Sequence, residues 1–323
     1  MDLKEILSPV KTELGIFDDR FKNAMRSKIA FVDVIARYIV KQKGKRIRPA
    51  LVLLTARACG EINESTYRGA SLVEILHTAT LIHDDVVDDA DTRRGFPSIN
   101  AVWKNKIAVL MGDYMLAKGL LLSLDNNDFQ FLKVTSDAVR RMSEAEILQI
   151  KKSKDLDIDE ATYLKIISDK TASLFATCCE IGATSAIPDE TFHKQMRAYG
   201  ENLGMVFQIR DDLLDYTGRK SITGKPTGLD LKEKKLTLPL IHSLSKAQKN
   251  TSKEIIRIIK DGGKKKDLQN VVRFAHEFGG IDYTTKKAEE YSTLALEALI
   301  PLPSSPAKDS LMHFVEFVME RSK

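Results

Sequence analysis

The sequence has few cysteines and lacks any long uninterrupted apolar run. Its 323 residues include three cysteines, Cys59, Cys178 and Cys179, and none of them belongs to a Cys-x-x-Cys pair. This odd, sparse set excludes a disulfide scaffold and a cysteine-rich zinc site, and it favours a reducing, cytoplasmic location. No apolar run reaches 18 residues, and the N-terminus has no signal-peptide core. We therefore predict no transmembrane segment.

Linkers and strong charge bias are also missing. No stretch rich in proline, glycine and serine divides the chain, so a single domain over residues 1–323 is expected. The formal net charge of +5 is spread along the sequence, which is a weak indication of anionic substrates and none of nucleic acid. Walker loops, zinc spacings and βαβ patterns are absent, whereas apolar positions recur at helical spacing. These features predict an all-α protein.

The most informative segment is a mostly apolar helix, expected from about residue 64 to 88, that ends in a run of aspartates. Asp84 and Asp88 are one turn apart, so their carboxylates project from the same face, and Asp85 is the next residue round. Clustered carboxylates of this kind suit a hard cation such as Mg2+. A solvated acidic helix end would explain one such cluster equally well.

A second cluster repeats the Asp-Asp-x-x-Asp spacing. Asp211, Asp212 and Asp215 follow another mostly apolar segment. Gln208 precedes Asp211 by three residues and is expected to face the same cavity. Two solvated acidic helix ends with identical spacing are a poor explanation, so the pair of clusters favours a metal site.

Basic residues and one histidine accompany the aspartates. Lys45 and Arg48 lie in a turn before a helix N-terminus, a plausible anion site. His77 lies two turns before the first aspartates on the same helix face. Arg93 and Arg94 are not spaced to pair with the metal carboxylates along the helix, so we expect them to bind phosphate oxygens. Considered alone, each of these residues is explained as well by an ordinary structural role.

These motifs, in this order, resemble the trans-type isoprenyl (polyprenyl) diphosphate synthases, and the octaprenyl type in particular; the resemblance covers essentially the whole chain. It implies one large helical bundle around a central cavity, in which Mg2+, an allylic diphosphate and isopentenyl diphosphate meet, and it implies a homodimer. The resemblance implies that isopentenyl diphosphate is bound by Lys45, Arg48, His77 and Arg94. It implies that the metal is held by Asp84, Asp88 and Asp211, while its bound water is oriented by Asp85, Asp212 and Asp215. The allylic substrate and its departing diphosphate are expected to contact Arg93, Lys170, Thr171, Gln208, Lys225 and Lys235.

Two further expectations follow from the resemblance. Thr171 is expected to hydrogen-bond a carbonyl of its own helix and to bend that helix. Ala79 and Thr80 are small where short-chain members carry an aromatic residue, which implies a long product of C30 or more. Close helix packing is an alternative reason for two small residues.

Other functions remain open at this stage. A short- or medium-chain (C15–C20) synthase and a non-catalytic subunit of a two-component synthase are the nearest alternatives. A terpene cyclase usually lacks the basic turn. A metal phosphohydrolase is suggested by the pair His83-Asp84 but needs further histidine ligands. Apolar helices between residues 100 and 150 offer a suitable dimer interface.

Overall fold

The computed structural model describes residues 1–42, 44–217, 229–263 and 265–320, and it confirms the predicted all-α fold. The described strands are a two-residue pair, β1 (Thr92–Arg93) and β2 (Phe96–Pro97), which are antiparallel. The helices are α1 (Leu3–Ile6), η1 (Ser8–Val10), α2 (Lys11–Met25), α3 (Ala30–Lys41), α4 (Ile47–Cys59), α5 (Glu64–Val87), α6 (Ile99–Leu124), α7 (Phe129–Asp155), α8 (Glu160–Ile167), η2 (Ser168–Ala172), α9 (Ser173–Ala186), α10 (Glu190–Thr217), α12 (Leu229–Lys232), α13 (Leu238–Lys246), α14 (Lys249–Lys260), α15 (Lys265–Glu277), α16 (Gly280–Ala298) and α17 (Pro306–Glu320).

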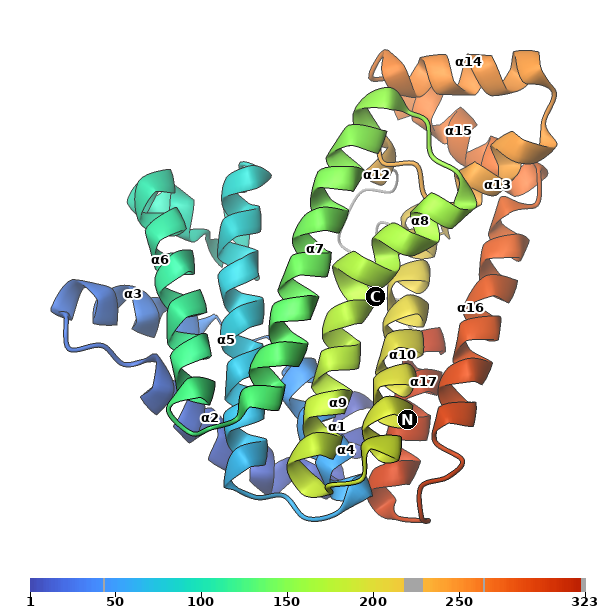
Figure 1. Ribbon diagram of the computed structural model, residues 1–323. Helices are drawn as coiled ribbons and strands as arrows, with labels where there is room; N and C mark the ends of the chain where they lie inside the picture. Colours follow the sequence, from blue (N-terminus) through green and yellow to red (C-terminus); the bar gives the residue numbers. More distant parts are fainter. Residues whose placement is uncertain (43, 218–228, 264, 321–323) are drawn as a thin grey trace.

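The long helices run side by side, with α5 packed against α4, α6 and α9, and α10 packed against α9 and α16 (Figure 1). The apolar residues of α5 occupy nearly all its faces, and residues 69–77 are all buried. A helix of that pattern can bury its side chains only at the centre of a bundle. Gly112 of α6 is placed where any Cβ would clash with the His83 ring, so glycine is needed for the close approach of α5 and α6.

Several helices, including α5, α6 and α8, begin at a side-chain cap. The Asp159 side chain accepts a hydrogen bond from Thr162 N at 2.7 Å at the start of α8. The sequence predicts a helix over residues 129–149 followed by a solvated basic run. Helix α7 instead continues to Asp155, because the lysines after Gln149 are good helix formers, and Lys152 of that run lines a cavity.

The apolar side chains form two clusters. One joins α4, α5, α6, α9 and α17, and the other joins α8, the C-terminal half of α10, and α13 to α16. Tyr291 packs against both clusters. This continuity agrees with one domain, which stays a prediction.

Candidate active site

The first aspartate set lies at the C-terminal end of α5. Asp84 is half-buried, and burial raises the pKa of its carboxyl to about 6, while Lys170 and Arg93 lower it and Glu146 and Asp88 raise it. The raised pKa shows that the nearby positive charges do not fully offset burial and the neighbouring carboxylates. The carboxylate is thus poised to gain a cationic partner.

Arg93 contradicts one expectation from the sequence. Its Nε donates to Asp85 Oδ1 at 2.7 Å, and Asp85 is buried, so an arginine of the motif does pair with a motif carboxylate. The reason is that the chain reverses after α5: Arg94 and Gly95 have positive φ values of 52° and 79° and form the turn between β1 and β2. Helical spacing could not reveal a contact made through a hairpin.

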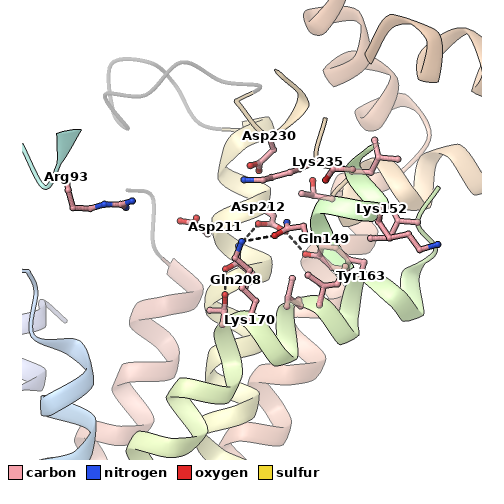
Figure 2. A pocket seen from close by; sticks show the side chains of 17 residues that line it. Arg93, Gln149, Lys152, Tyr163, Lys170, Gln208, Asp211, Asp212, Asp230 and Lys235 are labelled. Atoms are coloured by element: carbon pink, nitrogen blue, oxygen red, sulfur yellow. Dashed lines mark hydrogen bonds between the residues drawn. The ribbon is translucent and has the colours of Figure 1, made fainter. Parts of the chain in front are cut away.

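The second aspartate set lies on α10 beside a cavity of about 380 Å³ (Figure 2). Asp211 and Asp212 line it with Gln208, as predicted. Both oxygens of buried Asp212 accept hydrogen bonds at 2.7 Å, from Tyr163 Oη and from Gln208 Nε2. Burial raises the pKa of Asp212 above its ordinary value. Asp212 is therefore held by protein donors, which suits a carboxylate that orients water rather than one that binds a cation directly.

Asp230 is a site residue that sequence reasoning missed. It lines the same cavity, and its backbone N–H donates to Asp215 Oδ2 at 3.1 Å. Burial raises the pKa of its carboxyl to about 7, with Asp215 adding to the shift and Lys235 opposing it. Asp230 lies between two leucines in the sequence, so only the approach of α12 to α10 identifies it.

Lys170 and Thr171 are presented to this cavity by η2, a π-helical turn between α8 and α9. Lys170 Nζ donates to Gln149 Oε1 at 2.7 Å and forms an ion pair with Glu146. The predicted helix distortion is therefore present, but its predicted cause is wrong. Thr171 Oγ1 donates to Gln208 Oε1 at 2.8 Å, because α10 lies within reach, and not to a carbonyl of its own helix. Gln149 and Glu146 carried no sequence signal that marked them as site residues.

A separate cavity of about 460 Å³ brings together Lys45, Arg48, His77 and Arg94. These four predicted ligands of isopentenyl diphosphate come from three segments far apart in the sequence. Gly44 permits the convergence, since a Cβ there would lie 2.7 Å from the Arg94 guanidinium carbon. Arg94 in turn donates from Nη1 to Gln42 O at 3.0 Å. The arrangement is a basic cavity suited to an anion.

Arg48 and His77 are hydrogen-bonded to each other in this cavity. Arg48 Nη1 donates to His77 Nε2 at 2.9 Å, and since a guanidinium can only donate, we assign the ring proton to Nδ1. Burial, reinforced by Arg48 and Arg94, lowers the pKa of His77 well below its ordinary value, so the ring is neutral. Arg48 Nε is buried without a hydrogen-bond partner among the described residues. An orphaned cationic donor of this kind is a strong indication of an anionic ligand.

The carboxylates fit a divalent cation that completes its coordination with other oxygens. In residues 1–42, 44–217, 229–263 and 265–320 no three carboxylate, imidazole or thiol groups converge as a ready-made metal site. However, Asp84 and Asp230 have raised pKa values of about 6 and 7 in acidic surroundings. Hard oxygen donors that neighbouring lysine and arginine charges neutralise only in part match Mg2+, which binds few protein carboxylates and takes further oxygens from water and phosphate.

The remaining predicted residues fall in three places. Lys235 lines the first cavity, and its Nζ donates to Glu233 Oε2 at 2.6 Å. Asp88 lies at the end of α5, close enough to Lys235 for its charge to raise the pKa of that lysine against the lowering effect of burial. Ala79 is fully buried and Thr80 half-buried on α5. Lys225 lies outside the described residues.

Comparison with known proteins identifies polyprenyl diphosphate synthases as relatives of this chain. The family model described as "Polyprenyl synthetase" matches residues 30–275. The chain is 37% identical to an all-trans-nonaprenyl-diphosphate synthase (geranyl-diphosphate specific) of Rhodobacter capsulatus over 98% of both chains. It is 34% identical to the octaprenyl diphosphate synthase of Escherichia coli over 100% of both. It is 32% identical to heptaprenyl diphosphate synthase component 2 of Bacillus subtilis, over 99% of this chain and 91% of that one.

A solved structure shares the fold. The crystal structure of a polyprenyl synthase from Caulobacter crescentus, complexed with calcium and isoprenyl diphosphate, is similar with a TM-score of 0.90 and 32% identity. The similarity covers 100% of this chain and 98% of that one.

Proposed function

The chain belongs to the polyprenyl synthetase family, and we propose that it joins an allylic diphosphate head to tail with isopentenyl diphosphate to make a long all-trans polyprenyl diphosphate. As a polyprenyl diphosphate synthase it is a prenyltransferase. One observation carries the proposal: two separate cavities hold different sets of cations, and only the first of them also borders the aspartates of α10. Such a division suits two diphosphates of which one must leave.

The reaction breaks the C–O bond between the allylic carbon and its diphosphate. The residues of the first cavity favour this step because Lys170, Arg93 and Lys235 place positive charge where negative charge accumulates. Asp84, Asp88 and Asp211 would hold Mg2+, with Asp85, Asp212 and Asp215 orienting its water molecules. When bound, the metal supplies further neutralisation of the departing diphosphate. Thr171 and Gln208 fix one another beside this position.

The second substrate supplies the electrons for the new bond. Lys45, Arg48, His77 and Arg94 would hold the diphosphate of isopentenyl diphosphate, so that its double bond faces the allylic carbon. The double bond then forms the new C–C bond, and a proton leaves the carbon next to it. The base we propose for that proton is the released diphosphate. The apolar residues of α5 and α6 keep water from quenching the allylic cation.

We propose a product of C30 or more. Hepta-, octa- and nonaprenyl names among the relatives support a long product, and so do the small residues Ala79 and Thr80. A short- or medium-chain (C15–C20) product is the alternative.

The experiment that tests the function uses the purified chain alone with Mg2+. Diphosphate release should require both substrates, and the lipid product should be all-trans. Release with the allylic substrate alone would point to a hydrolase or cyclase. No release at all, restored by a second protein, would favour the two-component alternative that the relative named component 2 raises.

Removing a cation from the second cavity should weaken one substrate selectively. Arg48→Ala and Lys45→Ala should raise KM for isopentenyl diphosphate by about 10- to 150-fold, the equivalent of about 1.5 to 3 kcal/mol for a lost charge-assisted contact. Lys235→Ala, in the first cavity, should instead raise KM for the allylic substrate, and so should Lys225→Ala. Steady-state kinetics with each substrate varied will measure this. Equal weakening of both substrates in every variant would rule out two subsites.

We also propose a homodimer in which α6 contributes the interface. α6 is long and apolar enough to cross a membrane by composition alone, and a third of its most apolar window is buried. Leu110, Leu121 and Leu124 are at least half exposed on it. A second copy of the chain would cover these side chains, as the resemblance implies.

The three free cysteines, of which Cys178 and Cys179 are buried, support a reducing cytoplasmic location.

Sedimentation should therefore give twice the 36.2 kDa chain mass at micromolar concentration. Leu121→Asp should shift the mass to that of one chain, because a charge in an apolar interface is costly to desolvate. Leu294→Asp is the matched control, since Leu294 is 46% exposed on α16, away from α6. A single-chain mass for the unmodified protein would contradict the dimer.

A further inference from the structure

The π-helical turn η2 needs support from its surroundings. The Ser173 N–H donates to Ser168 O, five residues back, so the turn contains one residue more than an α-helical turn. Such insertions are rare, cost free energy and persist where neighbouring groups hold them. Lys170 and Thr171 lie within this turn. Whatever fixes its register therefore also fixes the direction in which these two side chains point.

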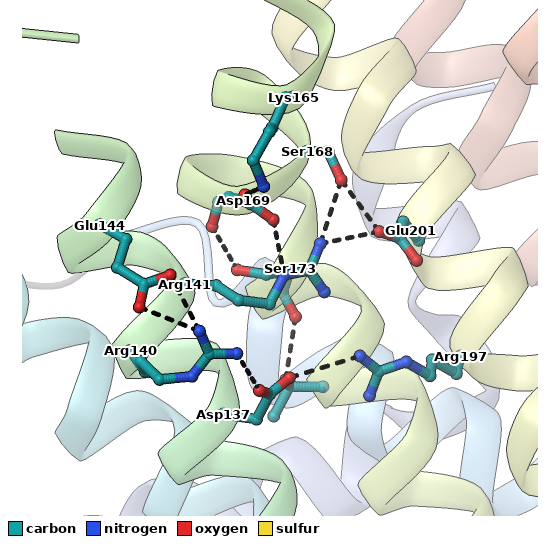
Figure 3. Close-up of polar contacts among 11 residues, drawn as sticks. Asp137, Arg140, Arg141, Glu144, Lys165, Ser168, Asp169, Ser173, Arg197 and Glu201 are labelled. Atoms are coloured by element: carbon teal, nitrogen blue, oxygen red, sulfur yellow. Dashed lines mark hydrogen bonds and ion pairs between the residues drawn. The ribbon is translucent and has the colours of Figure 1, made fainter. Parts of the chain in front are cut away.

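Arg141 of α7 contacts the turn through Ser168 and Asp169 (Figure 3). Arg141 Nε donates to Asp169 Oδ1 at 2.7 Å, and its Nη2 donates to Ser168 Oγ at 3.1 Å and to Glu201 Oε1 at 3.0 Å. Ser168 Oγ in turn donates to Glu201 Oε1 at 2.9 Å. Arg141 thus ties two consecutive residues of η2 to each other and to α10.

The contact between Arg141 and Asp169 is shielded from water. Asp169 is 7% exposed, and the Arg141 side chain is 15% exposed. Lys165 Nζ occupies the other oxygen of Asp169 at 2.7 Å. Although burial alone would raise it, Lys165 and Arg141 together lower the pKa of Asp169, so the carboxylate is ionised. A shielded, charge-assisted fork of this kind holds geometry better than a solvated ion pair.

The two residues of the turn that line the cavity are held by the same two helices, α7 and α10. Lys170 contacts Glu146 and Gln149 of α7, while Thr171 contacts Gln208 of α10. We propose that Arg141 is a positioning residue: it holds the π turn in register between α7 and α10 and so keeps Lys170 and Thr171 directed at the allylic diphosphate. This inference rests on the proposed function. It assigns Arg141 no contact with substrate.

The test is Arg141→Met, which keeps the length of the side chain and removes the fork. We expect kcat/KM for the allylic substrate to fall by about 10- to 100-fold, the loss typical of a small misplacement of reacting groups. KM for isopentenyl diphosphate should stay within about twofold, because its cavity does not include η2. Arg141→Lys, which can still reach Asp169 but cannot fork, should fold and show an intermediate loss.

Arg197→Met is the matched control. Arg197 is also a half-buried arginine linking α10 to its neighbours, through Glu180 at 2.6 Å and Asp137 at 3.8 Å, but those partners lie on α9 and α7. It should lower Tm as much as Arg141→Met does while kcat/KM for the allylic substrate is kept. Equal kinetic losses in the two arginine variants at matched Tm would overturn the proposal.

A double-mutant cycle decides whether Arg141 acts through Lys170. In a Lys170→Ala background, adding Arg141→Met should cost clearly less than it does in the unmodified protein, because one of the two groups that it positions is gone. Full additivity of the two losses would overturn the inference. An unmodified protein that shows no diphosphate release with both substrates would instead refute the proposed function, so the two failures are distinguishable.

Discussion

Asp84→Ala should lower kcat by about two to three orders of magnitude, the loss typical when a group that stabilises transition-state charge is removed. Asp211→Ala should do the same. Both residues lie in the aspartate sets that we propose hold Mg2+ on the departing diphosphate. Because that interaction strengthens as the C–O bond breaks, the loss should appear in kcat and not only in KM. Single-turnover product formation at saturating Mg2+ will measure it.

The same variant should leave the fold intact. Burial raises the pKa of Asp84 in the folded protein to about 6, above that of an unfolded chain. A carboxyl whose folded pKa is raised binds its proton more tightly when folded, so its ionisation reduces stability as pH rises through that range. At pH 7 Tm of Asp84→Ala should therefore equal or exceed that of the unmodified protein. A Tm below that of the unmodified protein would show that the activity is lost through unfolding.

Asp91→Ala is the matched control, because Asp91 belongs to the same acidic run but is exposed beyond the end of α5. It should retain kcat. Near-normal kcat in Asp84→Ala with Mg2+ saturating would remove this aspartate from the metal site, whatever the behaviour of Asp211→Ala.

Local periodicity predicted what depends on one helix. The spacing of Asp84 and Asp88, and of Gln208 and Asp211, is enough to place each pair on one face, and the structure confirms that Gln208 faces the cavity. The convergence of Lys45, Arg48, His77 and Arg94 needed the family resemblance. No periodicity connects a turn, a helix and a hairpin.

What the sequence did not reveal depends on tertiary contacts between segments. Arg93 reaches Asp85 because the chain reverses in a hairpin. Asp230 joins the second aspartate set because α12 returns to α10. Thr171 bonds Gln208 because α10 passes η2 closely, where Gly204 has no Cβ to meet Ala172. In each case the two partners are far enough apart in the sequence, or separated by a turn, that helical spacing gives no information.

The last prediction concerns product length and rests on α5 upstream of Asp84. Ala79 lies about 7.5 Å from Asp84 along the helix, five residues at 1.5 Å each. Its side chain belongs to the buried cluster that includes Met111 and Met115 of α6. Methionine side chains are flexible and can make way for an isoprenoid chain that enters between α5 and α6. A growing product that runs along α5 would then pass Ala79 after its first few units.

Ala79→Phe should shorten the product to about C15–C20 with little loss in the rate of the first condensation, because the ring would block the path beyond the substrates without touching either diphosphate. Ala79→Leu should give products of intermediate length, since a graded block is expected from graded side-chain size. Chromatography of the dephosphorylated products will measure both. If Ala79 only serves close packing of α5 on α6, the ring should instead cost about 1 to 3 kcal/mol of stability by overpacking. An unchanged product distribution from a folded, active Ala79→Phe enzyme would then mean that the chain grows along another wall of the bundle.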